Sequence, residues 1–265
     1  MNLKLGFIGA GNMAKAILEG LINNNVYMPD HINISDIDRV NSGKYAEKTG
    51  VNFCENNNSL VGNSDIIILA VKPNILPTVL EEIKTAAKDK LFISIVAGAS
   101  ISKISDILGK DCKIVRTMPN TPAMVSEGMT IISYGDLVKE NDKTATERIF
   151  ESIGRIEIMD ERYLNSVIAL TSSSPAYFFI MLEAMADAAV HAGIPRNISY
   201  KLAAQSMLGS AKMVLESGKH PAELKDMVCS PGGTTIEAVA ELENSGFRNA
   251  VISAMKECTD KANRI

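Results

Sequence analysis

The sequence has no tryptophan, three histidines and four widely spaced cysteines in 265 residues. The cysteines form no C-x-x-C pair, so we expect neither a disulfide framework nor a metal site, and a reducing compartment such as the cytoplasm follows. His31 and His191 lie outside every motif and His220 precedes Pro221 at a helix start, so we assign the histidines surface or capping roles. These residues are Cys54, Cys112, Cys229, Cys258, His31, His191 and His220.

The sequence also lacks a long hydrophobic run and an excess of positive charge. No stretch offers about 18 uninterrupted apolar residues, so no transmembrane helix is expected. Residues 1–6 lead straight into a strand-like segment, which leaves no room for a secretory signal. The net charge of -4 gives no general attraction to nucleic acid or to anionic membranes. We expect a cytoplasmic protein with neither of these partners.

The first part of the chain alternates short apolar runs with helical stretches, which is typical of a parallel sheet covered by helices. The run at 65–71 is almost entirely apolar, as a strand buried on both faces requires. The expected strands are 3–8, 32–35, 65–71, 91–96, 113–118, 129–134 and 155–159. A helix is expected at 12–23.

After about residue 161 long helical patterns dominate, at 162–192, 199–217, 221–227, 235–244 and 246–264. Residues 177–192 are apolar on more than one face, whereas a surface helix normally has a single apolar stripe. We therefore expect these helices to pack against a second subunit. The predicted fold is an N-terminal α/β domain at 1–160 followed by an all-α dimerisation domain at 161–265.

A glycine-rich turn joins the first strand to the first helix. Residues 9–14, Gly-Ala-Gly-Asn-Met-Ala, match G-x-G-x-x-A. Gly9 permits the tight turn, Gly11 lets the backbone approach a pyrophosphate, and Ala14 keeps the helix close to the sheet. The helix start then binds the phosphates. In this context the motif predicts a Rossmann-type dinucleotide-binding domain.

Asp36 follows the second strand, where an acidic residue can bind the ribose hydroxyls of NAD and repel a 2′-phosphate. We predict that NADH is used at least as well as NADPH. Two alternatives remain: Asp36 simply caps a turn, and Arg39 nearby takes the phosphate. The cofactor is therefore given as NADPH or NADH.

Residues 225–237 form the most informative segment of the C-terminal half. Ser230-Pro-Gly-Gly-Thr is a loop, and Thr234 to Glu237 has the S/T-x-x-E form of a capping box at a helix start. A loop and a helix N-terminus together form a carboxylate site. Read alone, the segment fits a plain turn before a helix equally well.

The order of the motifs along the chain resembles that of the pyrroline-5-carboxylate reductases. The similarity spans essentially the whole chain and is most specific in the Ser-Pro-Gly-Gly-Thr-Thr segment. The matching stretches are 6–13, 70–73, 118–122, 173–177 and 230–236. The resemblance implies reduction of 1-pyrroline-5-carboxylate to L-proline, the last step of proline biosynthesis, with a hydride from NAD(P)H.

The resemblance also implies residue roles in the cofactor site. Asn57 would lie near the adenosine half, and Val96, Ala97 and Gly98 would flank the nicotinamide. Asn120 with Pro122 would shape the floor of the pocket. The full set expected to contact the cofactor is Gly9, Gly11, Asn12, Met13, Asp36, Asn57, Ala70, Val71, Lys72, Pro73, Val96, Ala97, Gly98 and Asn120.

The substrate carboxylate is assigned to the C-terminal loop. Ser230 and the N–H groups of Gly233 and Thr234 would bind it, with Gly232 shaping the turn. By resemblance, the Thr235 hydroxyl hydrogen-bonds the ring nitrogen. Because a hydroxyl is a weak acid, Thr235 would orient a protonated iminium or relay a proton from water. No metal is required.

The resemblance also implies a homodimer with intertwined helical domains, or a larger assembly of such dimers. In the dimer, the substrate loop of one subunit would face the cofactor of the other.

The chain departs from the family in carrying Ser172 and Ser174 where glycines are common, which puts fine substrate preference in doubt. Lys72 is a rival catalytic acid. Another imine reductase and a 3-hydroxyacid dehydrogenase are rival enzymes, but 172–177 lacks the lysine that hydroxyacid enzymes use. A non-catalytic NAD(P) sensor is the rival of a different class.

Overall fold

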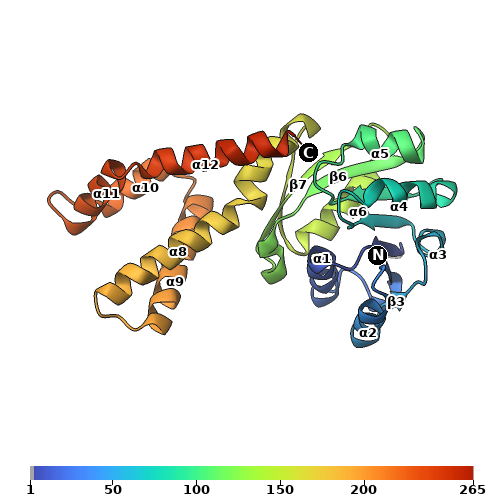
Figure 1. The fold of residues 1–265 in the computed structure, drawn as a ribbon, viewed down its shortest axis with the longest axis horizontal. Coiled ribbons are helices and arrows are strands. Elements are labelled where there is room, and N and C mark those ends of the chain that lie inside the picture. Colours follow the sequence, from blue (N-terminus) through green and yellow to red (C-terminus); the bar gives the residue numbers. More distant parts are fainter. Residues whose placement is uncertain (1–2, 265) are drawn as a thin grey trace. The chain divides into compact units, whose positions relative to one another are not determined.

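The computed structural model describes residues 3–264 and divides into two compact units (Figure 1). The first unit contains residues up to Ser172 together with those from Thr259 onward, and the second runs from Ser173 to Cys258. The predicted domain boundary at 160/161 stays a prediction, and each unit is described by itself.

The first unit is built on one twisted sheet, which has eight strands in the described residues, in the order β3-β2-β1-β4-β5-β6-β7-β8. Strands β1 to β6 pair in parallel, β7 is antiparallel to β6, and β8 is parallel to β7. The order β3-β2-β1-β4-β5-β6 is that of a dinucleotide-binding fold. The bounds are β1 Leu5–Ile8, β2 Ile32–Ser35, β3 Asn52–Phe53, β4 Ile66–Leu69, β5 Leu91–Ser94, β6 Lys113–Met118, β7 Gly128–Tyr134 and β8 Gly154–Ile158.

Helices cover both faces of this sheet. Successive side chains of a strand point to opposite faces, so Ile66 and Ile68 join one buried cluster while Ile67 and Leu69 join the other. The first cluster includes α1 and α6, and the second includes α3, α4 and α5. The helices are α1 Asn12–Asn23, α2 Arg39–Thr49, α3 Asn57–Gly62, α4 Leu76–Ile83, α5 Ile101–Leu108 and α6 Glu140–Glu151.

All seven strands predicted from the sequence are present, in the predicted order along the chain. The run at 65–71 shortens to Ile66–Leu69, because only its middle residues pair with β1 and β5. Strand β3 and the helices α2 to α6 were not predicted. Strand β3 has only two residues, too few for an alternating pattern to appear.

The second unit is helical. Helix α8 packs against α9, and no strand occurs among its residues. Its elements are α8 Ser174–His191, α9 Arg196–Ser217, α10 Pro221–Val228, α11 Thr234–Asn244 and most of α12 Phe247–Ala262.

The predicted helix at 162–192 is interrupted in the structure. A 3₁₀ turn, Glu161–Tyr163, leads into α7, Leu164–Val167, and then into a π-helical turn, Ile168–Ser172, before α8 begins. The helical stretch Glu161–His191 is nevertheless long and apolar enough to cross a bilayer by length and composition alone. The prediction that the chain has no transmembrane helix stays a prediction.

Candidate functional site

The glycine-rich turn leaves open space above the start of α1. Gly9 has φ +97°, and a Cβ built on it would lie 2.6 Å from the carbonyl oxygen of Ala70, so only glycine fits there. A Cβ on Gly11 would meet nothing within 4 Å. Gly11 is the N-cap of α1 and supplies no side-chain hydrogen bond, so the helix start is free of side-chain caps. This arrangement fits a pyrophosphate, as predicted.

Most of the predicted cofactor residues lie at the carboxyl-terminal ends of the parallel strands. Those in the turns after β1, β2, β4, β5 and β6 all lie where parallel strands end, which is where such folds bind nucleotides. Gly11, Asn12 and Lys72 are exposed, and Val96 is buried beneath the loop it begins. The individual assignments stay predictions.

Asp36 is bonded to the glycine turn itself. Its Oδ2 accepts the N–H of Ala10 at 2.7 Å, and its Oδ1 accepts the N–H of Asp38 at 2.8 Å. Asp38, not Asp36, is the N-cap of α2, where its side chain accepts the N–H of Asn41. The Nδ2 of Asn41 also donates to Asp38 Oδ2 at 2.6 Å, and this side-chain bond, together with the backbone bond, lowers the pKa of the Asp38 carboxyl. Arg39 is exposed at the first position of α2.

Asn57 is held from two sides. Its Oδ1 accepts the hydroxyl of Ser35 at 3.0 Å, and its Nδ2 donates to Glu82 at 2.8 Å. Ser35 is the last residue of β2, so this bond places the first residue of α3 beside the strand that precedes Asp36. The neighbouring Asn56 is the N-cap of α3.

Asn120 ties two elements together through both ends of its amide. Its Oδ1 accepts the N–H of Met129 in β7 at 2.8 Å, and its Nδ2 donates to the carbonyl of Thr171 at 3.0 Å. Asn120 therefore connects the π-helical turn to β7. In the same turn, the buried hydroxyl of Ser172 has no hydrogen-bond partner among the described residues.

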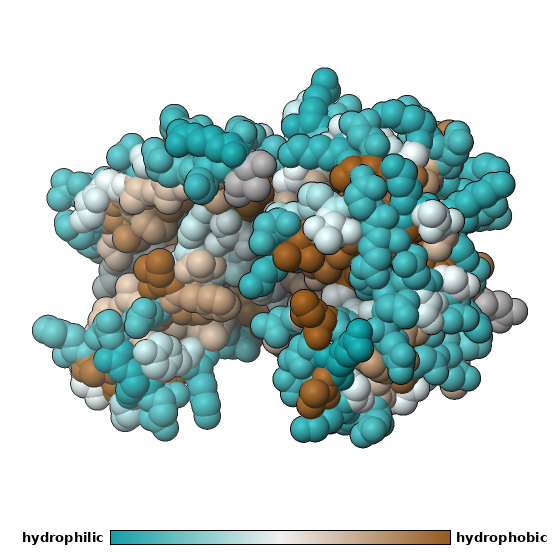
Figure 2. Space-filling view, turned by 45° about the vertical axis from the view of Figure 1, so that its right-hand side comes forward, coloured by the Kyte–Doolittle hydropathy of each residue, from teal (hydrophilic) through white to brown (hydrophobic). Residues whose placement is uncertain are grey.

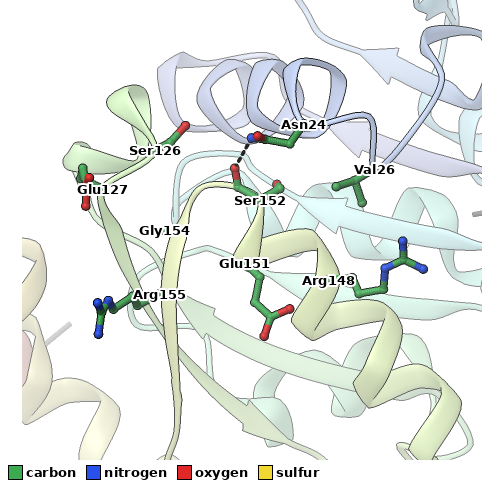
Figure 3. A pocket seen from close by; sticks show the side chains of 9 residues that line it. All are labelled: Asn24, Val26, Ser126, Glu127, Arg148, Glu151, Ser152, Gly154 and Arg155. Carbon is green, nitrogen blue, oxygen red and sulfur yellow. Dashed lines mark hydrogen bonds between the residues drawn. The ribbon is translucent and has the colours of Figure 1, made fainter.

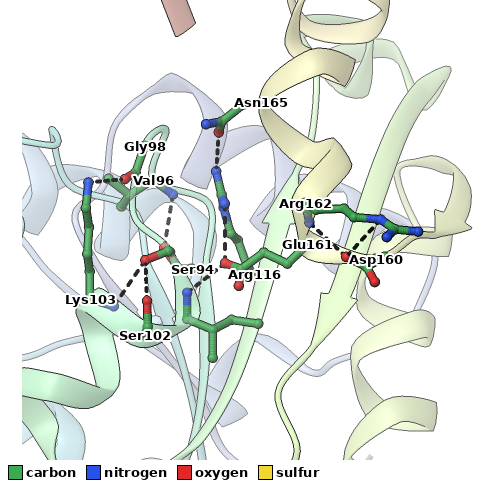
Figure 4. Close-up of polar contacts among 12 residues, drawn as sticks. Ser94, Val96, Gly98, Ser102, Lys103, Arg116, Asp160, Glu161, Arg162 and Asn165 are labelled. Carbon is green, nitrogen blue, oxygen red and sulfur yellow. Dashed lines mark hydrogen bonds and ion pairs between the residues drawn. The ribbon is translucent and has the colours of Figure 1, made fainter. Parts of the chain in front are cut away.

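The Val96–Gly98 loop is braced by polar contacts that the sequence interpretation missed (Figure 4). The N–H of Val96 donates to Ser94 Oγ at 3.2 Å, and Lys103 Nζ donates to the carbonyl of Gly98 at 3.1 Å. Beside them the buried Arg116 of β6 pairs with Glu161 at 3.3 Å. An arginine inside a strand predicted to be buried was the signal for this network.

The loop before α11 differs from its prediction in one respect. The N-cap of α11 is Gly233 and no side chain caps the helix, so the expected capping box at Thr234 to Glu237 is wrong. The helix begins one residue earlier, which makes Thr234 its first residue. The N–H of Gly233 donates to the carbonyl of Ser230 at 3.0 Å and closes the turn.

The residues of this loop still present an uncapped helix start. Ser230, Gly232 and Thr234 are exposed and Thr235 is half-buried. Gly232 has φ +67°, in the left-handed region that favours glycine. A Cβ on Gly233 would lie 2.3 Å from Ser230 Oγ, so a larger residue there would displace the Ser230 hydroxyl. With no side-chain cap present, the first N–H groups of α11 are open to an anion.

The 173–177 motif lies at the start of α8, where Ser173 is the N-cap residue. The thiol of Cys258 in α12 lies 3.2 Å from the hydroxyl of Ser173. Burial, with a smaller contribution from Cys258, raises the pKa of the Tyr177 phenol, so it stays protonated near neutral pH. This cluster joins α8 to α12 within the helical unit.

Two cavities of the first unit lie away from the predicted site residues. One, of about 510 Å³, is shown in Figure 3 and lies where the end of α1 and the end of α6 meet β8. There Asn24 donates to the carbonyl of Ser152 at 2.9 Å. The other, of about 590 Å³, borders β3 and α3. Among the described residues no group of histidine, cysteine or carboxylate side chains could hold a metal ion.

Comparisons with known proteins agree with the two-part architecture. Residues 161–265 match the family model for pyrroline-5-carboxylate reductase dimerisation, and residues 4–98 match that for coenzyme F420-dependent NADP oxidoreductases. The chain is 47% identical over 266 aligned residues to pyrroline-5-carboxylate reductase of Escherichia coli strain K12, covering 100% of this chain and 99% of the relative.

The chain belongs to the pyrroline-5-carboxylate reductase family. A solved Coxiella burnetii family member superposes with a TM-score of 0.92 at 34% identity, covering 100% of this chain and 98% of the other. A Plasmodium falciparum member, solved with NADP bound, gives 0.90 at 35% identity, with 98% and 97% covered. The resemblance and the predicted fold class are therefore confirmed.

Proposed function

We propose that this member of the pyrroline-5-carboxylate reductase family reduces 1-pyrroline-5-carboxylate to L-proline with NADPH or NADH. The observation that carries the proposal is the end-to-end identity of 47% to a reductase of that name. The open glycine turn above α1 and the uncapped start of α11 supply sites for a pyrophosphate and for a carboxylate.

The chemistry divides between the cofactor and the protein. When bound, the nicotinamide supplies the hydride that reduces the C=N bond. The protein's residues then have to orient the ring and hold its carboxylate. We assign the carboxylate to Ser230 and the N–H groups at the start of α11. The hydroxyl of Thr235 is assigned to the ring nitrogen.

The turn geometry refines this assignment. Since the Gly233 N–H is bonded to Ser230 in the turn, the Thr234 N–H and the Ser230 hydroxyl are the better donors to a carboxylate. The Thr235 hydroxyl is too weak an acid to be the proton source by itself. It orients an iminium that arrives protonated, or relays a proton from water.

We further propose that the protein acts as a homodimer in the cytoplasm. Its helical unit exposes large apolar side chains along α8, including Phe179 at 64% and Ile180 at 67%, and hydrophobic atoms lie at its surface in Figure 2. A patch of this kind marks an interface. The same helices belong to the segment that matches the dimerisation model. Docking between subunits explains the membrane-like hydropathy of Glu161–His191 without a membrane.

The test is oxidation of NADH and of NADPH by the purified protein with pyrroline-5-carboxylate, with proline identified by chromatography. Gly9→Ala, whose Cβ would clash with Ala70, should abolish cofactor binding. Gly43→Ala is the matched control, because Gly43 lies in α2 with nothing within 4 Å of its Cβ position. Tight cofactor binding without turnover on this imine would refute the proposal and favour a different cyclic imine or an NAD(P) sensor.

A further inference from the structure

Arg116 is a buried cation in an inner strand of the sheet. It is 4% exposed in β6, where it lies opposite Ser94, the last residue of β5. A buried guanidinium is costly unless it is paired and hydrogen-bonded. Its Nη1 lies 3.3 Å from Glu161 Oε1, and its Nη2 donates to Asn165 Oδ1 at 2.9 Å. Both partners come from the segment after β8, so Arg116 anchors that segment to the sheet (Figure 4).

The same oxygen of Glu161 has a second donor. Glu161 Oε1 accepts the backbone N–H of Ile101 at 2.7 Å. Ile101 is the first residue of α5, where N–H groups have no partner within the helix. The N-cap Ser100 satisfies a different donor, the N–H of Lys103. Glu161 therefore completes the cap of α5 from a distant part of the chain.

These contacts fix the loop between β5 and α5 at both ends. At its start, Ser94 accepts the N–H of Val96, and at its end Glu161 holds Ile101. Lys103, one turn into α5, donates to the carbonyl of Gly98. Gly98 has φ +73°, so the loop turns sharply there. A loop held in this way has little freedom to shift.

We propose that Glu161 and Arg116 are positioning residues for hydride transfer, because they hold the Val96–Gly98 loop against which the nicotinamide would lie. This inference rests on the proposed function. Arg116 fixes the carboxylate of Glu161, and that carboxylate fixes the start of α5. Neither side chain touches the reacting atoms. A displacement of the loop by about 1 Å can reduce the rate of a positioned reaction by about 10²-fold.

The proposal is tested with three substitutions in the full-length protein. Glu161→Ala removes both contacts, whereas Glu161→Gln keeps an acceptor for the Ile101 N–H and loses only the charge. Arg116→Met removes the cation, so the Glu161 carboxylate loses its ion-pair partner but can still accept the Ile101 N–H. Arg162→Gln is the matched control: it removes an arginine next to Glu161 whose side chain is 70% exposed and pairs with Asp160 at the surface.

The first measurement is amide hydrogen exchange in the cofactor-free protein. In Glu161→Ala we expect exchange over residues 97–103 to accelerate by roughly ten-fold, the effect of one lost hydrogen bond, while β1 keeps its protection. Glu161→Gln should restore most of that protection, and Arg162→Gln should match wild type. Equal acceleration throughout the chain would overturn the proposal, because it would show only a global loss of stability.

The second measurement is steady-state kinetics of the same variants. We expect kcat to fall by about ten-fold or more in Glu161→Ala, with the KM for the imine nearly unchanged and partial recovery in Glu161→Gln. Unchanged kcat in both Glu161→Ala and Arg116→Met would overturn the proposal. Should wild-type protein have no turnover, the proposed function fails instead, and the exchange data alone decide whether Glu161 holds the loop.

Discussion

The carboxylate of Asp36 accepts a hydrogen bond from the backbone N–H of Ala10, with 2.7 Å between Oδ2 and the nitrogen. This contact joins the end of β2 to the glycine turn after β1. The other oxygen accepts the N–H of Asp38. Asp36 therefore supports the turn, and it also places a negative charge beside the predicted adenosine ribose.

The charge of Asp36 should set the cofactor preference. In Asp36→Asn we expect the ratio of kcat/KM for NADPH to that for NADH to rise by about ten-fold, since one repulsive charge near a 2′-phosphate is removed. Binding of both cofactors should weaken slightly, because the amide can accept only one of the two backbone N–H groups. The measurement is steady-state kinetics with each cofactor.

Asp38→Asn is the control for Asp36→Asn. It removes an equal charge two residues away, and asparagine is an equally good N-cap for α2. A ratio that changes as much in this control as in Asp36→Asn would contradict a specific role for Asp36. A wild-type protein that strongly prefers NADPH would refute the prediction that NADH serves at least as well.

Thr235→Ala should lower turnover by about 10- to 10³-fold, the usual range for losing one transition-state hydrogen bond. Thr235 is the second residue of α11 and is half-buried. Thr235→Ser keeps the hydroxyl and should recover most of the rate. Ser210→Ala, on the exposed face of α9, is the control. Unchanged kcat in Thr235→Ala would remove Thr235 from the site.

Local patterns in the sequence account for the sheet and for the glycine turns. The apolar run that contains β4 predicted a buried strand, and the G-x-G-x-x-A spacing predicted the helix Asn12–Asn23 with its observed bounds. These features depend on neighbouring residues. Glycine at position 9 is required by one close contact with the adjacent strand, and the motif already contains that requirement.

Contacts between distant parts of the chain could not be foreseen in the same way. Glu161 meets Ile101 across 60 residues, and Asn120 meets Thr171 across 51. Nothing near Glu161 in the sequence indicates its partner. The capping box failed for a different, local reason: the S/T-x-x-E spacing was present, but Gly233 in the turn took the N-cap position.

Tyr27→Phe should make the protein more resistant to alkaline unfolding. Tyr27 is 2% exposed, and its hydroxyl is buried without a hydrogen-bond partner among the described residues. Burial, together with Asp65, raises the pKa of Tyr27 to about 12. Between pH 10 and that value the unfolded chain loses a proton that the folded chain keeps, so the stability falls as the pH rises.

Phenylalanine has no such proton, so this loss should disappear in Tyr27→Phe. Near neutral pH the variant should be as stable as wild type or more stable by about 1 kcal/mol, because an unpaired buried hydroxyl is removed. Urea unfolding at pH 7 and at pH 11 measures both effects. Tyr163→Phe, with an exposed ring, is the control. The same pH dependence in wild type and Tyr27→Phe would contradict the burial argument.

Phe179→Glu should dissociate the proposed dimer. Phe179 is 64% exposed in the helical unit, so a charge there leaves the fold of a single chain almost unchanged. Burying that charge against a partner's apolar helices would be strongly unfavourable. Sedimentation velocity over a range of concentrations should show a dimer, or a multiple of it, for wild type and a smaller species for the variant. Leu137→Glu, which places the same charge on an exposed leucine of the first unit, is the control. A monomeric wild-type protein would contradict the proposed interface, and a variant that stays dimeric would place the interface away from Phe179.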